Sequence, residues 1–202
     1  VYRSLCEVKC DVIANGHTLD LLRRAHAFGL NLAKLDIRQS SDKHRKLFKS
    51  IIAYLGLGDY EKWSENEKID FLTKEFESKR PLIPRDIKLN KEEAEVWETF
   101  QMISKLPREC LGAYVISMAS SVSDILSVLI LQKEAGIKSY LRIVPLFETY
   151  NDLKNSANIM ENLYSNKWYV NYFNHKQEIM IGYSDSSKDV GKLSASWAQY
   201  CA

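Results

Sequence analysis

The stretch LGAYVISMASSVSDILSVLILQKEAGIKSYLRIVPLF, residues 111–147, carries the repeating pattern on which the fold prediction is based. Its two ends, residues 111–118 and 140–147, are apolar runs typical of strands that are buried on both faces. Between them lies a helix-length segment that ends at Gly136, and glycine is common just beyond a helix C-terminus. A strand, a helix and a second strand in this order predict two parallel strands joined by a helical crossover.

The same pattern recurs on both sides of this stretch. Upstream, a helix predicted over 19–28 precedes an apolar strand at 32–39. Downstream, a helix over 148–168 leads to a strand at 177–185 and then to a helix at 186–200. The sequence therefore predicts an α/β, helix-rich fold with about four parallel strands.

A helical excursion, residues 41–105, separates the first strand from the other three. Ser64 with Glu67, and Asn90 with Glu93, have the spacing of capping boxes, so each pair predicts the start of a helix. The excursion therefore consists of helices rather than of further strands.

A closed barrel of strand–helix units needs eight of them, so this chain would supply about half of a (β/α)8 TIM-like barrel. A doubly wound open sheet is the competing architecture, and the lack of a glycine-rich dinucleotide turn after any strand disfavours it. Both ends of the chain look cut. We expect 1–202 to be a single segment of a larger domain: helix plus strand over 1–40, the excursion, and three strand–helix units over 106–202.

Composition excludes several classes of protein. Acidic and basic residues are mixed along the chain and nearly balance, with a net charge of +2, which predicts neither a nucleic-acid nor a membrane partner. No apolar run approaches the roughly 20 residues of a membrane span, so we expect a cytoplasmic location. Four cysteines in a chain of this kind are expected to be reduced, inside and not bound to metal.

Charged side chains stand where the predicted strands end, which is where barrel enzymes place their working residues. Glu148 ends the third strand and Asp185 the fourth, so parallel pairing would bring their backbones to about 5 Å. Two carboxylates at that separation suit Mg²⁺ or Mn²⁺. The alternative is that each acid only caps the helix that follows it.

Two basic residues complete the predicted rim. Arg38 ends the first strand and could bind a phosphate or carboxylate, or instead form an ion pair with Asp36 or Asp42. Lys188 is predicted to begin a helix, where a cation opposes the helix dipole, and such a placement hints at function. The alternative for Lys188 is a solvated surface lysine.

The four histidines show no metal-binding spacing. We expect His17, His26, His44 and His175 to lie on the surface or to pack in the core.

Four segments resemble sequence motifs of one enzyme family: LDIRQ at 35–39, AYVISMA at 113–119, VPLFET at 144–149 and QEIMIGYSDSSKDVGKLSASW at 177–197. Through them the whole chain, in order, resembles phosphoenolpyruvate carboxylase. The resemblance implies part of a catalytic barrel of an enzyme that joins bicarbonate to phosphoenolpyruvate and releases oxaloacetate and phosphate. It implies Mg²⁺ or Mn²⁺ without biotin, carboxyphosphate and a metal-stabilised enolate, and a homotetrameric parent.

The resemblance also implies roles for individual residues. Glu148 and Asp185 match the family's metal ligands, Arg38 matches a phosphate-binding arginine, and Lys188 matches an active-site lysine. Ser40 departs from the family, which usually has glutamate after LDIRQ. The family's TAHPT histidine would lie upstream of the chain and its FHGRGG loop downstream, so we expect the chain alone to be inactive.

Two alternatives come from other functional classes. The chain or its parent could be a non-catalytic scaffold or regulatory subunit that retains half of the barrel. It could also belong to another Mg²⁺ barrel enzyme that acts on phosphoenolpyruvate or a related keto acid.

Overall fold

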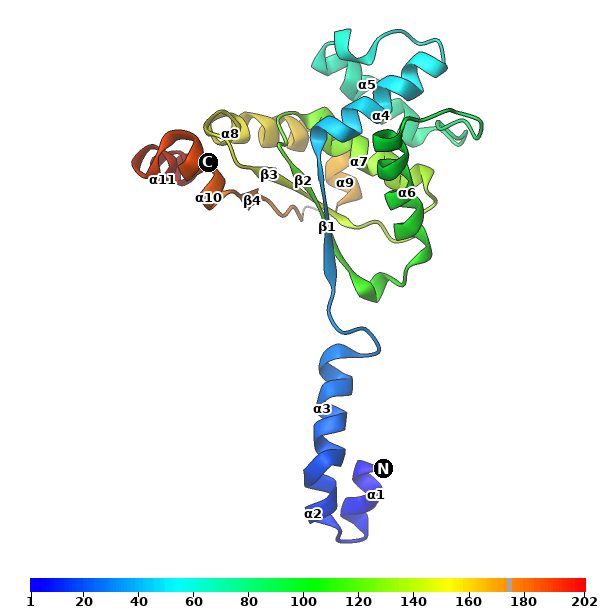
Figure 1. The fold of residues 1–202 in the computed structure, drawn as a ribbon, viewed down its shortest axis with the longest axis vertical. Helices are drawn as coiled ribbons and strands as arrows, with labels where there is room; N and C mark the ends of the chain where they lie inside the picture. The colour runs from blue at the N-terminus through cyan, green and yellow to red at the C-terminus, as the bar shows by residue number, and fades with distance from the viewer. Residues whose placement is uncertain (174–175) are drawn as a thin grey trace.

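A computed structural model describes residues 1–173 and 176–202. Its described strands form one four-stranded, all-parallel sheet, and helices dominate the rest of the molecule (Figure 1). The strands are β1 (Leu35–Ser40), β2 (Leu111–Ser117), β3 (Arg142–Phe147) and β4 (Met180–Ile181). The predicted α/β, helix-rich fold with about four parallel strands is confirmed.

The helices lie where the sequence places them, with a few differences in their bounds. They are α1 (Tyr2–Glu7), α2 (Asp11–Ile13), α3 (Leu19–Phe28), α4 (Ser41–Tyr54), α5 (Glu65–Glu77), α6 (Lys91–Lys105), α7 (Val122–Glu134), α8 (Tyr150–Ser165), α9 (Lys167–Tyr172), α10 (Tyr183–Val190) and α11 (Lys192–Cys201). Short helical turns occur at Ala14–Thr18, Tyr60–Lys62 and Arg108–Cys110.

The last strand and helix differ most from the prediction. β4 has two residues instead of the nine predicted over 177–185, because Tyr183 already begins α10. The single helix predicted over 186–200 is divided at Gly191, which has a φ of +80° and separates α10 from α11.

The excursion between β1 and β2 consists of α4, α5 and α6, as predicted. Ser64 accepts a hydrogen bond from the Glu67 N–H, and the Glu67 carboxylate accepts one from the Ser64 N–H. Asn90 and Glu93 make the same reciprocal pair at the start of α6. Both predicted capping boxes are confirmed.

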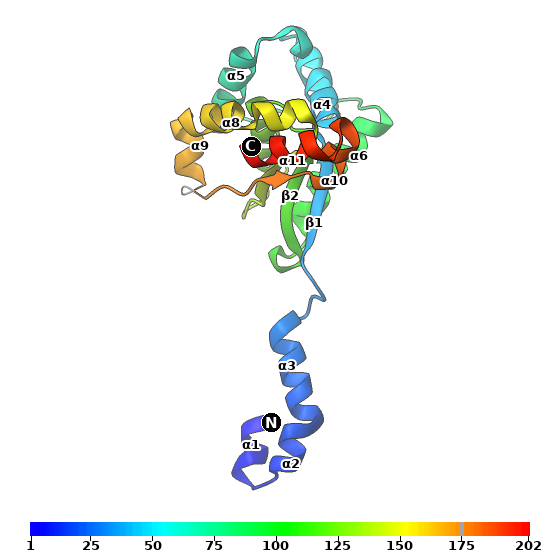
Figure 2. The same cartoon turned by 90° about the vertical axis from the view of Figure 1, so that its left-hand side faces the viewer.

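The main core lies between the sheet and the helices packed on one of its faces (Figure 2). Tyr114 and Ile116 of β2 join Phe48 of α4 and Phe100 of α6 there, all fully buried. Burial of each such side chain contributes on the order of 1.5–3 kcal/mol. The opposite face of the sheet holds a small separate cluster of strand residues alone: Ala113, Val115, Val144 and Leu146.

The strand order follows the chain order, β1-β2-β3-β4. A doubly wound sheet reverses its order at a switch point and carries helices on both faces, and the described strands and core show neither feature. The order and the one-sided helix layer fit a sector of a barrel. Closure of that barrel stays a prediction.

The first helices extend away from the sheet, which α3 meets only through the loop before β1 (Figure 1). α3 has the bounds predicted from the sequence, and Gly29 ends it with a φ of +59°. Its apolar residues Leu21, Leu22 and Phe28 are exposed. Within the described ranges, the structure contains no helix with the length and apolar character that a membrane crossing requires.

A buried histidine links the excursion to the sheet. His44 of α4 is fully buried, and its Nε2 lies 2.8 Å from the Tyr114 hydroxyl in a hydrogen bond. Its Nδ1 has no hydrogen-bond partner among the described residues. Burial lowers the pKa of His44 to about 4, so the ring is neutral at pH 7.

This histidine predicts an acid-sensitive fold. In the unfolded chain His44 is protonated below the ordinary histidine pKa of about 6.5. In the folded chain it stays neutral down to about pH 4. The stabilising contribution is therefore complete above pH 6.5 and falls with decreasing pH, by about 2 kcal/mol at pH 5. We expect His44→Gln to remove this part of the pH dependence.

The measurement is urea unfolding of the full-length protein at pH 7 and pH 5, with hydrogen exchange of residues 111–117 as the local reporter. His26→Gln, which changes an exposed histidine on α3, is the control and should keep the wild-type pH dependence. Equal pH dependence in wild type and His44→Gln would contradict the prediction.

A second prediction concerns the close approach of β3 and the end of β4. Gly182 donates its N–H to the Phe147 carbonyl at 2.8 Å, and a Cβ added to it would lie 2.7 Å from the Glu148 Cβ and 2.9 Å from its Cα. The Cα and Cβ atoms of Glu148 are fixed by its backbone and cannot rotate away. We expect Gly182→Ala to lower the free energy of unfolding by about 1–3 kcal/mol, measured by urea unfolding. Ser184→Ala, at an exposed position on α10, should leave it unchanged.

Candidate functional site

The ends of the four strands meet around the Glu148 carboxylate, which directly follows β3. Glu148 is 7% exposed. One of its carboxylate oxygens accepts the Met118 N–H at 3.0 Å, and the other accepts Arg38 Nη2 at 3.3 Å. With Gly182 packed against its backbone, Glu148 contacts residues from or next to β1, β2 and β4.

Arg38 lies on β1, two residues before Ser40, the last residue of the strand, and its side chain is about half exposed. Both partners that the sequence suggested are wrong. The Asp36 carboxylate accepts the Ala113 N–H at 2.7 Å, and Asp42 pairs with Arg45 at 3.6 Å. Arg38 pairs instead with Glu148, 110 residues further along the chain. Its partly exposed guanidinium retains N–H donors for an anionic ligand.

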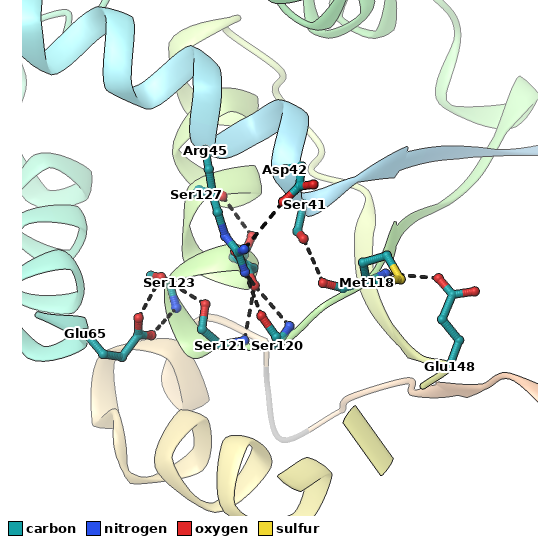
Figure 3. A network of polar contacts seen from close by, with 11 residues as sticks. Ser41, Asp42, Arg45, Glu65, Met118, Ser120, Ser121, Ser123, Ser127 and Glu148 are labelled. Carbon is teal, nitrogen blue, oxygen red and sulfur yellow. Dashed lines mark hydrogen bonds and ion pairs between the residues drawn. The ribbon is translucent and has the colours of Figure 1, made fainter. Parts of the chain in front are cut away.

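Met118 holds a backbone conformation that its residue type seldom adopts. Its φ is +55°, in the left-handed region. The Met118 carbonyl accepts the Ser41 hydroxyl at 2.7 Å while its N–H donates to Glu148 (Figure 3). These two hydrogen bonds fix the turn after β2 and aim a backbone N–H at the carboxylate.

A polar network supports that turn from the side of the excursion (Figure 3). Arg45 of α4 donates to both Asp124 oxygens, at 2.8 and 2.7 Å, and to the Ser120 hydroxyl at 2.7 Å. Glu65 of α5 accepts both the N–H and the hydroxyl of Ser123, at 2.8 and 2.9 Å. The Asp124 carboxylate is almost fully buried, so this bidentate pair is stronger than a surface ion pair.

Asp185 and Lys188 lie on α10, which begins immediately after Gly182. Asp185 is in the first turn, and its carboxylate accepts Lys188 Nζ at 3.4 Å. The predicted position of Lys188 is wrong: it lies in the last turn of α10, where the helix dipole favours a cation. Its placement therefore gives no sign of function by itself.

The helix-cap alternative fails for Glu148 and persists for Asp185. Thr149 and Asp152 form the capping box of α8, so Glu148 is not needed there. Asp185 occupies the first turn of α10, where a carboxylate is favourable, although it makes no side-chain cap hydrogen bond.

The donor set suits a hard divalent cation. Glu148 and Asp185 would supply carboxylate oxygens, and the buried Glu148 already lies beside a cation, Arg38. Asp185 does not end the fourth strand as predicted, because β4 ends at Ile181 and Asp185 lies in the first turn of α10. Within the described ranges, no group of three or more histidine, cysteine or acidic side chains is arranged so that it could hold a metal ion. A cation held by these two carboxylates would take its other ligands from water and other oxygen atoms, as Mg²⁺ commonly does in proteins.

Among the residues that the structure describes, no histidine or cysteine takes part in this site. His17 and His26 are exposed and His44 is buried, while His175 lies outside the described residues. All four cysteines are free. Cys6, Cys10 and Cys110 are half-buried, and the exposed Cys201 contradicts the expectation that all four lie inside.

Three residues of the site were missed at the level of sequence. Gly182 is a glycine directly after an apolar run, which is a known signal of close backbone approach. Met118 carries no such signal, because its role is in its backbone. Asp189 accepts the Tyr150 N–H at 2.9 Å across 39 residues, a contact that no local pattern predicts.

Comparison with known proteins agrees with the quoted motifs. The family model described as phosphoenolpyruvate carboxylase matches residues 1–202. A phosphoenolpyruvate carboxylase of Hahella chejuensis is 49% identical over 201 residues, which is 100% of this chain and 23% of that protein. One of Marinobacter nauticus is 51% identical with the same coverage, and phosphoenolpyruvate carboxylase 1 of Sorghum bicolor is 49% identical over 100% of this chain and 21% of its own length.

The chain thus spans about a quarter of the length of the curated relatives that it matches. The matched residues include Arg38, Glu148 and Asp185. The chain belongs to the phosphoenolpyruvate carboxylase family.

Proposed function

We propose that this chain is a single segment of the catalytic barrel of a cytoplasmic, homotetrameric phosphoenolpyruvate carboxylase. The enzyme would form oxaloacetate and phosphate from phosphoenolpyruvate and bicarbonate. The observation that carries the proposal is the Arg38–Glu148 ion pair, because it joins the candidate phosphate-binding residue to a candidate metal ligand at the strand ends. Family membership supports the same reaction.

Glu148 and Asp185 would hold Mg²⁺ or Mn²⁺ through their carboxylate oxygens. The hydrogen bond from the Met118 N–H orients one oxygen of Glu148 and leaves the other, now paired with Arg38, for the cation. When bound, the cation supplies positive charge that stabilises the enolate oxygen formed from the substrate.

Arg38 would bind the phosphoryl group of phosphoenolpyruvate. In the first step a bicarbonate oxygen attacks phosphorus and the bond from phosphorus to the enol oxygen breaks, which gives carboxyphosphate and the enolate of pyruvate. The planar guanidinium can donate two parallel hydrogen bonds to the moving phosphoryl oxygens. Arg38 would leave Glu148 as the phosphoryl group and the metal arrive.

Lys188 would balance the anionic charge gathered at the site. Its side chain is 77% exposed and pairs with Asp185 only at 3.4 Å, so it can turn toward a substrate anion at little cost. Carboxyphosphate then releases phosphate and carbon dioxide, and the enolate carbon bonds to carbon dioxide to give oxaloacetate. No biotin is needed, because carboxyphosphate itself carries the carboxyl group. The family's TAHPT and FHGRGG segments, outside this chain, would serve these later steps.

The first test is Asp185→Asn in the full-length protein. We expect Mn²⁺ to bind at least about 10-fold more weakly, as measured by calorimetry, because residue 185 loses its negative charge. Oxaloacetate formation in the same samples should fall with it.

Asp20→Asn is a matched control, because Asp20 on α3 also forms an exposed i, i+3 pair, with Arg23 at 3.7 Å. It should change neither quantity. Unchanged Mn²⁺ binding in Asp185→Asn would mean that Asp185 is not a metal ligand and only favours the start of α10. Metal binding without any turnover in the wild-type full-length protein would favour the non-catalytic scaffold.

Arg38→Gln should move metal binding and turnover in opposite directions. Without substrate, Mn²⁺ should bind about fivefold more tightly, because it no longer has to displace Arg38 from Glu148, an ion pair that contributes about 1 kcal/mol. Turnover should fall at least about 100-fold, because a donor to the transition-state charge is lost. Arg38→Lys should give an intermediate rate, since an ammonium group cannot form the fork.

Arg142→Gln is the control for this variant, because it breaks another arginine–glutamate pair, at 3.2 Å to Glu178, at the opposite end of β3. Weaker Mn²⁺ binding in Arg38→Gln would show that Arg38 supports the metal site instead of competing for it.

A further inference from the structure

Helix α10 carries two of the candidate site residues but has almost no apolar attachment to the protein. Ser186 is its one buried residue, and it is polar. The helix has eight residues, lacks a side-chain N-cap and ends at Gly191. A helix this short is not stable by itself, so its position depends on specific contacts.

Most of those contacts stay within the C-terminal segment. The Ser186 hydroxyl donates to the Gly182 carbonyl at 2.6 Å, and the Gln199 amide of α11 donates to the Ser186 oxygen at 2.6 Å. These bonds hold α10 to its own first turn and to α11. They do not fix its rotation relative to the segment that carries Glu148.

One side-chain hydrogen bond makes that connection. The Asp189 carboxylate accepts the Tyr150 N–H at 2.9 Å, and among the described residues this is the side-chain hydrogen bond that links α10 to α8. Tyr150 is the first residue of α8 and lies two positions after Glu148. The positive end of the α8 dipole also favours a carboxylate there.

The spacing along α10 gives this bond its significance. Asp185 and Asp189 are four residues apart, so their side chains lie on the same face of the helix with Cβ atoms about 5–6 Å apart. A bond from Asp189 to the start of α8 therefore turns Asp185 toward the same side. This hydrogen bond therefore joins α10, the helix that carries Asp185, to Tyr150, which lies two residues after Glu148.

We propose that Asp189 is a positioning residue that sets the separation and orientation of the Asp185 carboxylate relative to Glu148. It contacts neither substrate nor metal and acts through the Tyr150 N–H. The inference rests on the proposed function, in which Glu148 and Asp185 share a divalent cation. A residue that merely stabilises the start of α8 would leave metal affinity unchanged.

The test compares Asp189→Ala with Asp189→Asn in the full-length protein, with Mn²⁺ binding followed by electron paramagnetic resonance without substrate. Asparagine keeps an oxygen that can accept the Tyr150 N–H, whereas alanine does not. We expect Asp189→Ala to weaken binding about 10- to 100-fold, the usual loss when an outer partner of a ligand is removed. Asp189→Asn should remain within about threefold of wild type.

A second pair of variants removes the donor and leaves Asp189 intact. Tyr150 is the first residue of α8, where proline is tolerated, so Tyr150→Pro deletes the N–H without breaking the helix. It should weaken Mn²⁺ binding as much as Asp189→Ala, and the double variant should be no weaker than either. Tyr150→Ala, which keeps the N–H, should bind like wild type.

Glu161→Ala, which removes an exposed carboxylate from α8, is the control for charge and should bind normally. Normal binding in both Asp189→Ala and Tyr150→Pro would overturn the inference, as would equal weakening in Asp189→Ala and Asp189→Asn. The Asp185→Asn variant distinguishes a failure of the positioning role of Asp189 from a failure of the proposed cation site. If it loses Mn²⁺ while Asp189→Ala does not, only the positioning role is wrong; if it binds Mn²⁺ normally, the cation site itself is wrong.

Discussion

The buried carboxylate of Glu148 is the constraint on which the strand ends depend. An unpaired buried charge is costly, so its two oxygens require partners. They find them on different strands: the Arg38 guanidinium from β1 and the Met118 N–H from the end of β2. Gly182, at the end of β4, is a glycine because the Glu148 backbone occupies the space of a side chain. A shift of any one strand would leave this carboxylate with a missing partner or a steric clash.

The need to satisfy Glu148 extends to the helical excursion. Met118 donates its N–H to Glu148 from a strained, left-handed conformation, and its carbonyl accepts the Ser41 hydroxyl at the start of α4. The Arg45–Asp124 pair then fixes α4 to the start of α7, and Glu65 brings in α5. The excursion is therefore part of the support of the strand ends, not an appendage to them.

The features that the sequence predicted are those with local causes. Parallel strands follow from apolar runs separated by helix-length segments, and the capping boxes follow from pairs of residues three apart. The partner of Arg38 could not be predicted, because Glu148 is 110 residues away and two nearer acids, Asp36 and Asp42, are equally plausible partners in the sequence. The bounds of β4 and α10 were predicted wrongly for another reason. The polar residues from Tyr183 onward can either extend a strand or start a helix, and hydrogen bonds donated by Ser186 and Gln199 stabilise the helix.

The charges around the strand ends suggest how the site could serve anionic substrates. Each candidate metal ligand is paired with its own cation, Glu148 with Arg38 and Asp185 with Lys188, so the four side chains carry no net charge. Both cations are at least half exposed, which makes the pairs weak and easily exchanged. In the proposed function, a divalent cation that takes over the two carboxylates would release both basic side chains. The site would then carry a net charge of +2, with its basic groups free to bind the phosphoryl and carboxylate groups of the substrate, so that metal binding and substrate binding would favour each other.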